Sequence, residues 1–168
     1  LDAANDKSYP GSGTTWSDLS GNGNDGILTN GPTFDSGNLG SIDFDGTNDY
    51  VQTTLSNSSG DWIHSIVFWM KLNIDQSSIN SRVDPFSIGV ASDSRYSAMD
   101  INNGNVNWYF YNNDTRTYSN LFFANTWYHI ALTYTGGGAT TSTKTMYING
   151  VKHTWGTNSG TNYGNNLN

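Results

Sequence analysis

The sequence predicts an all-β protein, an antiparallel β-sandwich, and three observations predict it. Apolar and polar residues alternate in several short runs with the period of two that is typical of half-buried strands. Asn103-Gly104 and Asn149-Gly150 supply the positive φ angles that a two-residue hairpin turn needs. All 14 acidic residues are Asp, and 19 residues are Gly. Because both residue types favour turns over helix interiors, we expect strands and loops.

The expected strands follow one another at the spacing of a sandwich. In the run Ile66–Ile74, which contains Phe68, successive residues alternate between two faces. The run Tyr128–Tyr134 alternates in the same way, and Ile130 and Leu132 share one face with the two tyrosines, which we call the tyrosine face. The Asn149-Gly150 turn should fold the last two strands into a hairpin. The candidate strands are Ser41–Asp45, Tyr50–Thr54, Ser65–Ile74, Phe86–Ala91, Tyr96–Ile101, Val106–Tyr111, Thr117–Phe123, Tyr128–Tyr134, Met146–Asn149 and Val151–Trp155.

Length and the two ends define the expected domain. The 168 residues are most simply one domain, residues 1–168, long enough to bury roughly 70% of the unfolded chain's surface. The chain opens abruptly at Leu1 and stops in the polar run Gly164–Asn168. Since a sandwich must pair or hide its edge strands, we expect this domain to lack terminal strands and to be part of a longer polypeptide.

Charge and hydropathy exclude two classes of partner. The net charge is −7, so the chain repels phosphate and we expect no nucleic-acid partner. The most apolar window, Ile66–Met70, is far shorter than the ~18 residues of a membrane span, so we expect no membrane insertion. There is no Cys, which excludes disulfides and thiol chemistry.

Five segments carry a resemblance to a known family. They are Leu1–Phe34, Ile42–Val51, His64–Leu72, Thr126–Tyr134 and Met146–Val151. In this order they resemble the laminin-G-like domains of the concanavalin A-like lectin/glucanase superfamily, of the type found in bacterial surface and phage structural proteins. The resemblance implies a jelly-roll sandwich. It also implies calcium at the sandwich rim, because relatives often carry it there.

One run is unusually aromatic. Trp108, Tyr109, Phe110 and Tyr111 follow one another, so aromatic rings fall on both faces of one expected strand. An exposed row, either Trp108 with Phe110 or Tyr109 with Tyr111, would stack on the apolar face of a sugar ring. The alternatives are an aromatic core layer and a contact with a neighbouring domain or subunit.

A glycine-rich loop offers oxygen ligands for a metal. Asp18, Asn22, Asn24 and Asp25 are closely spaced on a flexible backbone, which suits Ca²⁺, and Asp49 is a candidate for completing the site. The alternative is that these side chains form Asx-turns with their own backbone.

Catalysis is not expected. Superfamily glucanases use a pair of Glu residues, and this chain has no Glu. Asp43 and Asp45 lead into a turn, and His64, His129 and His153 lack the spacing of metal ligands. An Asp-based glycosidase remains as a third alternative.

The sequence therefore predicts a non-catalytic adhesion module. We expect an extracellular, cell-surface or virion-surface location and recognition of a surface glycan. The alternative is a structural virion component, a phage capsid decoration or tail-fibre module, that contacts neighbouring protein or forms a homo-oligomer.

Overall fold

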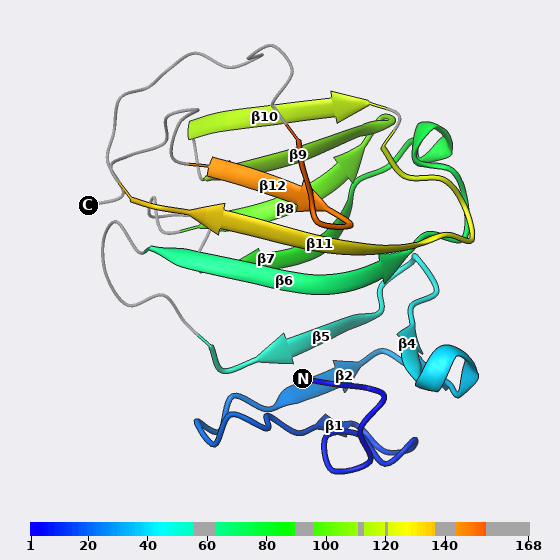
Figure 1. Ribbon diagram of the computed structural model, residues 1–168. Coiled ribbons are helices and arrows are strands. Elements are labelled where there is room, and N and C mark those ends of the chain that lie inside the picture. Colours follow the sequence, from blue (N-terminus) through cyan, green and yellow to red (C-terminus); the bar gives the residue numbers. More distant parts are fainter. Residues whose placement is uncertain (56–62, 90–95, 111–112, 120, 137–143, 154–168) are drawn as a thin grey trace. The chain divides into compact units, whose positions relative to one another are not determined.

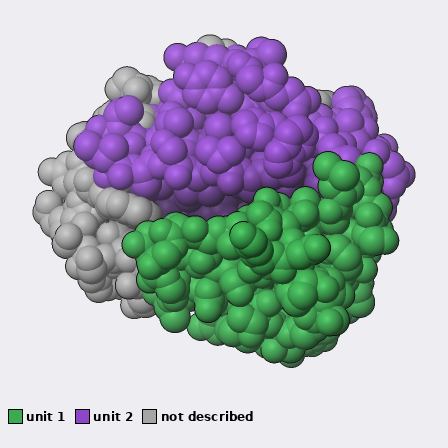
Figure 2. All heavy atoms as spheres, turned by 60° about the horizontal axis from the view of Figure 1, so that its bottom comes forward, with its two compact units in different colours: residues 1–56 green, residues 57–168 purple. Residues whose placement is uncertain are grey.

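The structure is a computed structural model. It describes residues 1–55, 63–89, 96–110, 113–119, 121–136 and 144–153, with the backbone alone at 110 and 113–119. Every strand pairing in this part of the chain is antiparallel, which confirms the predicted all-β class (Figure 1). The chain divides into two compact units, Leu1–Ser56 and Asn57–Asn168, which Figure 2 shows in different colours.

The first unit consists of short strands around a small aromatic cluster. Its sheets have the orders β1-β2-β5 and β3-β4. Tyr9 is buried and packs against Trp16 and Phe34, with ring centroids 6.5 and 5.6 Å apart. The elements are β1 (Thr15–Trp16), β2 (Gly26–Thr29), β3 (Thr33–Asp35), η1 (Gly37–Leu39), β4 (Ser41–Asp43) and β5 (Tyr50–Thr53).

The second unit is a sandwich of two four-stranded sheets, β10-β9-β8-β7 and β13-β12-β11-β6 (Figure 1). The sheets face each other across one core, as the contact between Phe68 of β6 and Phe86 of β7 shows. The elements are β6 (His64–Lys71), η2 (Gln76–Ser78), β7 (Val83–Ile88), β8 (Ser97–Asn102), β9 (Asn105–Phe110), β10 (Asn113–Ser119), β11 (Trp127–Tyr134), β12 (Lys144–Ile148) and β13 (Val151–His153).

The predicted alternation identifies which side chains form the core. In β11 the tyrosine face, Tyr128 to Tyr134, is buried, while the intervening side chains are only half-buried. Met99 and Trp108 of the opposite sheet are fully buried, and the Trp108 indole Nε1 donates to Ser97 Oγ at 3.2 Å. The ammonium of Lys144 lies 5.6 Å from the Trp108 ring centroid. Trp108 is therefore a core residue shared by both sheets.

Both Asn-Gly turns form as predicted. Asn103 and Gly104 have φ of 48° and 71°, and Asn149 and Gly150 have φ of 51° and 79°. A Cβ at Gly104 would also be crowded, because it would lie 3.3 Å from Ser77 Cα. These turns set the registers of the β8–β9 and β12–β13 hairpins.

A buried glutamine fastens the β8–β9 turn to the rest of the sandwich. Gln76 Nε2 donates to the Gly104 carbonyl at 2.9 Å. Its Oε1 accepts from the amides of Leu121 and Phe122, each at 3.0 Å. Three segments distant in sequence are thereby held by one side chain.

Strand ends differ from the prediction at several places. β6 ends at Lys71 rather than Ile74, and Ile74 is exposed. β10 spans Asn113–Ser119, earlier than expected. The short strands β1 to β3 were not predicted, because two to four residues are too few for a period to be read. Neither helix of the described residues has the length and apolarity that a membrane span requires.

Candidate functional site

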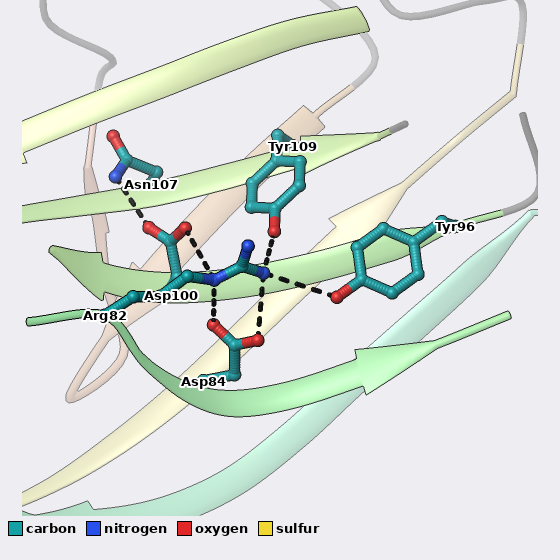
Figure 3. Close-up of polar contacts among 6 residues, drawn as sticks. All are labelled: Arg82, Asp84, Tyr96, Asp100, Asn107 and Tyr109. Atoms are coloured by element: carbon teal, nitrogen blue, oxygen red, sulfur yellow. Dashed lines mark hydrogen bonds and ion pairs between the residues drawn. The ribbon is translucent and has the colours of Figure 1, made fainter. Parts of the chain in front are cut away.

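A polar network of six described residues lies on the outer face of the β7–β8–β9 sheet (Figure 3). Met99 and Trp108 point inward, so their strand neighbours point outward. The register places Asp100 opposite Asn107 and Ala98 opposite Tyr109 on that outer face. The network consists of Arg82, Asp84, Tyr96, Asp100, Asn107 and Tyr109.

Arg82 is the centre of the network. Its Nε and Nη2 donate to the two carboxylate oxygens of Asp84 at 2.7 and 2.9 Å, a two-point pairing of guanidinium and carboxylate. Nε also lies 3.4 Å from Asp100 Oδ2. Nη2 donates to the hydroxyls of Tyr96, at 3.4 Å, and of Tyr109. One guanidinium therefore fixes two carboxylates and two phenols.

An irregularity in β7 brings the carboxylates together. Val83 pairs with Ile101 and Phe86 with Met99, so Asp84 and Pro85 together face a single residue, Asp100. This is a β-bulge, and Pro85 suits it because proline has no N–H to donate to the ladder. The bulge aims Asp84 and the preceding Arg82 at Asp100.

The surroundings shift the pKa values of the network. Burial raises the pKa of the Asp100 carboxyl, although Asn107 Nδ2 donates to Asp100 Oδ1 at 2.6 Å and Arg82 opposes the shift. The hydrogen bond between Arg82 and Asp84 raises the pKa of Arg82. Burial raises the pKa of the Tyr109 phenol, which therefore stays a neutral hydrogen-bond donor. With both carboxylates ionised, the network carries one net negative charge.

The network is partly open to solvent. The Arg82 and Asp84 side chains are 45% and 32% exposed. The half-buried Tyr109 ring lies 5.4 Å from the Arg82 guanidinium and 5.9 Å from the Tyr96 ring. Carboxylate acceptors, amide and guanidinium donors and a fixed aromatic ring thus occur side by side. This combination binds a neutral molecule that has both hydroxyl groups and an apolar face.

The predicted aromatic row must be corrected at Trp108. Its side chain has no exposed surface, so it cannot stack on a ligand. Of the two predicted rows, the one with Trp108 and Phe110 is therefore excluded, and Trp108 is wrong as a ligand-binding residue. The period of two leaves Tyr109 on the outer face. The side chain of Phe110 and the whole of Tyr111 lie outside the described residues.

The glycine-rich loop of the first unit forms Asx-type contacts. Asp18 accepts from Ser20 N, Ser20 Oγ and Asn24 N at 2.8, 2.7 and 3.1 Å. These bonds, the Ser20 amide first, lower the Asp18 pKa. Asp25 Oδ1 accepts from the Asp18 amide at 2.7 Å, and the Asn22 amide lies 3.4 Å from Ser20 Oγ. Among the described residues no group of three or more His or acidic side chains is placed to hold a metal. Calcium at this loop stays a prediction.

Asp49 does not belong to that loop. Gly26 pairs with Thr53 and Thr29 with Tyr50, so Asp25 and Asp49 flank opposite ends of the β2–β5 pair. They are roughly 16 Å apart along the strands. Asp49 Oδ2 instead accepts from the Asp45 amide at 3.1 Å within its own turn. The prediction that Asp49 completes the loop site was wrong.

Sequence reasoning missed most of the network. The Asn103-Gly104 turn would have given the register that sets Asp100 opposite Asn107. Arg82 and Asp84, two residues apart, would share a face of a strand beginning there. No local sequence pattern predicts the bulge at Pro85. The contact between Arg82 and Asp100, which depends on this bulge, could therefore not be predicted.

Comparison with known families identifies the class. The family model of the concanavalin A-like lectin/glucanases superfamily matches residues 45–168. The chain belongs to this superfamily. The match covers four of the five segments that carried the resemblance, the second from residue 45 on, and leaves out Leu1–Phe34. No curated protein and no solved structure matches the sequence.

Proposed function

We propose that the chain is a non-catalytic carbohydrate-binding module that recognises a neutral surface glycan through the Arg82 network. The observation that carries the proposal is the position of this network: a pre-bonded, partly exposed polar cluster beside an aromatic ring, on a sheet of a lectin/glucanase-type sandwich. Because the network is fixed before a ligand arrives, binding orders few side chains, and this reduces its entropic cost.

Each part of the network has a function in this proposal. The Tyr109 ring stacks on the C–H face of a sugar. The Asp84 carboxylate accepts from hydroxyl groups and the Arg82 guanidinium donates to them, whereas the nearly buried Asp100, together with Asn107, orients Arg82. One bidentate ion pair supports the proposal further, because it keeps the Asp84 carboxylate oriented.

The charges favour a neutral ligand. The network is net negative and the chain has a charge of −7, so a carboxylated or sulfated sugar is repelled here. Arg82 is already engaged by Asp84 and Asp100 and leaves little positive charge for an anion.

The pairing of both carboxylates with one cation supports the non-catalytic part of the proposal. A glycosidase needs one carboxylic acid that is protonated and a second that attacks or activates water. Here Asp84 is held at two points by Arg82, and the Asp100 side chain, which also contacts Arg82, is only 9% exposed, so neither carboxyl is free to reach a glycosidic bond. Hydrolysis of a polysaccharide by the protein would replace this proposal with the Asp-based glycosidase.

We also propose an extracellular, cell-surface or virion-surface location, where such a module would meet its glycan. Stable self-association without glycan binding would favour the alternative, a structural module of a virion.

A glycan array containing neutral and acidic sugars tests the proposal. Tyr109→Ala should weaken binding of the selected neutral glycan about tenfold, since stacking on an aromatic ring contributes on the order of 1–2 kcal/mol. Tyr109→Phe keeps the ring and should lose less. Asp84→Asn should weaken binding, whereas Asp6→Asn, the same change at an exposed carboxylate of the first unit, should not. If no neutral glycan binds, or if Tyr109→Ala binds like the wild type, the proposal fails.

A further inference from the structure

The outer face of the other sheet has a different chemistry. Its residues are those that alternate with the buried ones on β6, β11 and β12, together with their neighbour on β13. We call it the basic face and define it by Trp69, Lys71, Trp127, His129, Tyr147 and Lys152.

Aromatic rings and cations alternate across this face. Lys71 pairs with Trp127, and its ammonium lies 5.3 Å from the Trp127 ring centroid. In the next outward pair, Trp69 and His129 form an edge-to-face contact with centroids 5.2 Å apart. The Trp69 side chain is nevertheless 64% exposed, so most of its indole surface is open to solvent.

The face extends over the whole width of the sheet. Ala131 links Val67 of β6 to Tyr147 of β12, which in turn pairs with the exposed Lys152 of β13. Lys71 and Lys152 lie on strands three positions apart, which separates them by at least about 14 Å. Such a span suits an extended polymer better than a single sugar.

Charge separates this face from the rest of the molecule. None of the 14 Asp residues lies in β6, β11, β12 or β13. All three His residues lie in these four strands, but only His129 is on the outer face, because His64 and His153 pair with the buried Tyr134 and Met146. A chain with a charge of −7 thus has one sheet that carries only basic charged side chains. The cations of this face therefore attract an anion, although the chain as a whole is negative.

We propose that the basic face binds a polysaccharide that carries carboxylate groups. Sugar rings stack on the exposed Trp69, and carboxylates pair with Lys71 and Lys152 at the two ends of the face. The occupant is anionic because the face has cations and no carboxylate of its own. This site is separate from the Arg82 network, which lies on the opposite side of the sandwich and favours neutral sugars.

Polygalacturonate and its fully methyl-esterified form are a matched pair of probes, because they differ in charge but not in their sugar. With EDTA present, which excludes bridging by divalent ions, calorimetry at low salt should show binding of the acid form and at least about fivefold weaker binding of the ester. Raising NaCl from 0.05 to 0.5 M should weaken binding of the acid form, since screening reduces the attraction.

Variants locate the site. Trp69→Ala should weaken polygalacturonate binding about tenfold. The double variant Lys71→Gln/Lys152→Gln should weaken it about fivefold and keep the aromatic rings in place. Lys7→Gln, which removes an exposed lysine of the first unit, is the charge-matched control and should bind like the wild type. A far-UV spectrum unchanged from that of the wild type checks that each variant is folded.

The outcomes separate this inference from the proposed function. Equal binding of acid and ester, or wild-type binding by both Trp69→Ala and the double lysine variant, overturns the basic-face site. If polygalacturonate does not bind and the protein self-associates in a Trp69-dependent manner, the face is a protein interface and the inference is wrong. Tyr109→Ala reports on the Arg82 network alone, and it should reduce neutral-glycan binding without affecting polygalacturonate.

Discussion

The two outer faces of the sandwich share one core and differ in almost everything else. On the β7–β8–β9 side, Arg82 is bonded to Asp84 and Asp100, and the polar groups satisfy one another. On the other side, Trp69 is largely exposed, and the nearby cation Lys71 contacts an aromatic ring instead of a carboxylate. In our proposals, the first face is prepared for a neutral ligand by its internal hydrogen bonds, whereas Lys71 and Lys152 of the second face attract an anion.

The difference shows that, in a sandwich, neighbouring residues of one strand can serve different purposes: one stabilises the core and the next is available for binding. Successive residues of a strand face opposite sides, so inward positions are constrained by packing and outward positions are free to diverge. Trp108 and Tyr109 are adjacent in β9, yet the first is core and the second belongs to a polar network.

The largest expected effect contrasts two tryptophans. Trp108→Ala should lower the free energy of unfolding by about 3–5 kcal/mol, because it removes a fully buried ring from between the sheets. Trp69→Ala should lower it by less than about 1 kcal/mol, since that ring is mostly exposed. Urea unfolding of both variants measures the difference, and similar values for the two would contradict the shared core.

A smaller effect contrasts two cations. Arg82→Met should cost about 1–3 kcal/mol, because the nearly buried Asp100 loses its positive partner. Lys71→Met should stay within about 0.5 kcal/mol. Equal unfolding free energies for the two variants would show that the Arg82 network does not stabilise the fold.

The pH dependence of stability sharpens the contrast for one carboxyl. Burial raises the pKa of Asp100, so the folded protein keeps this proton at pH values where the unfolded chain, with an Asp pKa of about 3.9, has lost it. The contribution of Asp100 to stability is therefore present below about pH 4 and is lost as the pH rises through the raised pKa.

Asp100→Asn removes this titration. Relative to the variant, the wild type should lose unfolding free energy as the pH rises from about 4 through the raised pKa of Asp100. Unfolding curves at several pH values measure this change, and parallel pH profiles for the two proteins would contradict it.

The smallest expected effect concerns the loop of the first unit. Asp18 already accepts three hydrogen bonds from Ser20 and Asn24, so its turn forms without a metal. If the predicted calcium site also forms, excess Ca²⁺ should raise Tm relative to EDTA. Because those bonds lower the Asp18 pKa, its contribution to stability is present above about pH 4 and is lost on acidification. Asp18→Ala should lower Tm at neutral pH, and a wild-type Tm that is the same in excess Ca²⁺ and in EDTA would contradict the predicted calcium site.

Sequence reasoning was strongest where local geometry decides the structure. The alternation in β11 and the turns at Asn103-Gly104 and Asn149-Gly150 need only neighbouring residues, and all three formed as expected. Sequence reasoning was weakest in two places. In the strand that contains Trp108, aromatic rings lie on both faces, so the sequence does not tell which face is buried. At Pro85, a bulge shifts the strand register.

By itself, the sequence determined the all-β class and the two Asn-Gly hairpins, because periodicity and turn chemistry are properties of neighbouring residues. Only the tertiary structure decided that Trp108 is buried while Tyr109 is not, that Asp49 lies far from Asp25, and that Arg82 joins Asp84 to Asp100. These outcomes depend on strand pairing and on which face meets the opposite sheet, and both are fixed by contacts between residues distant in the chain.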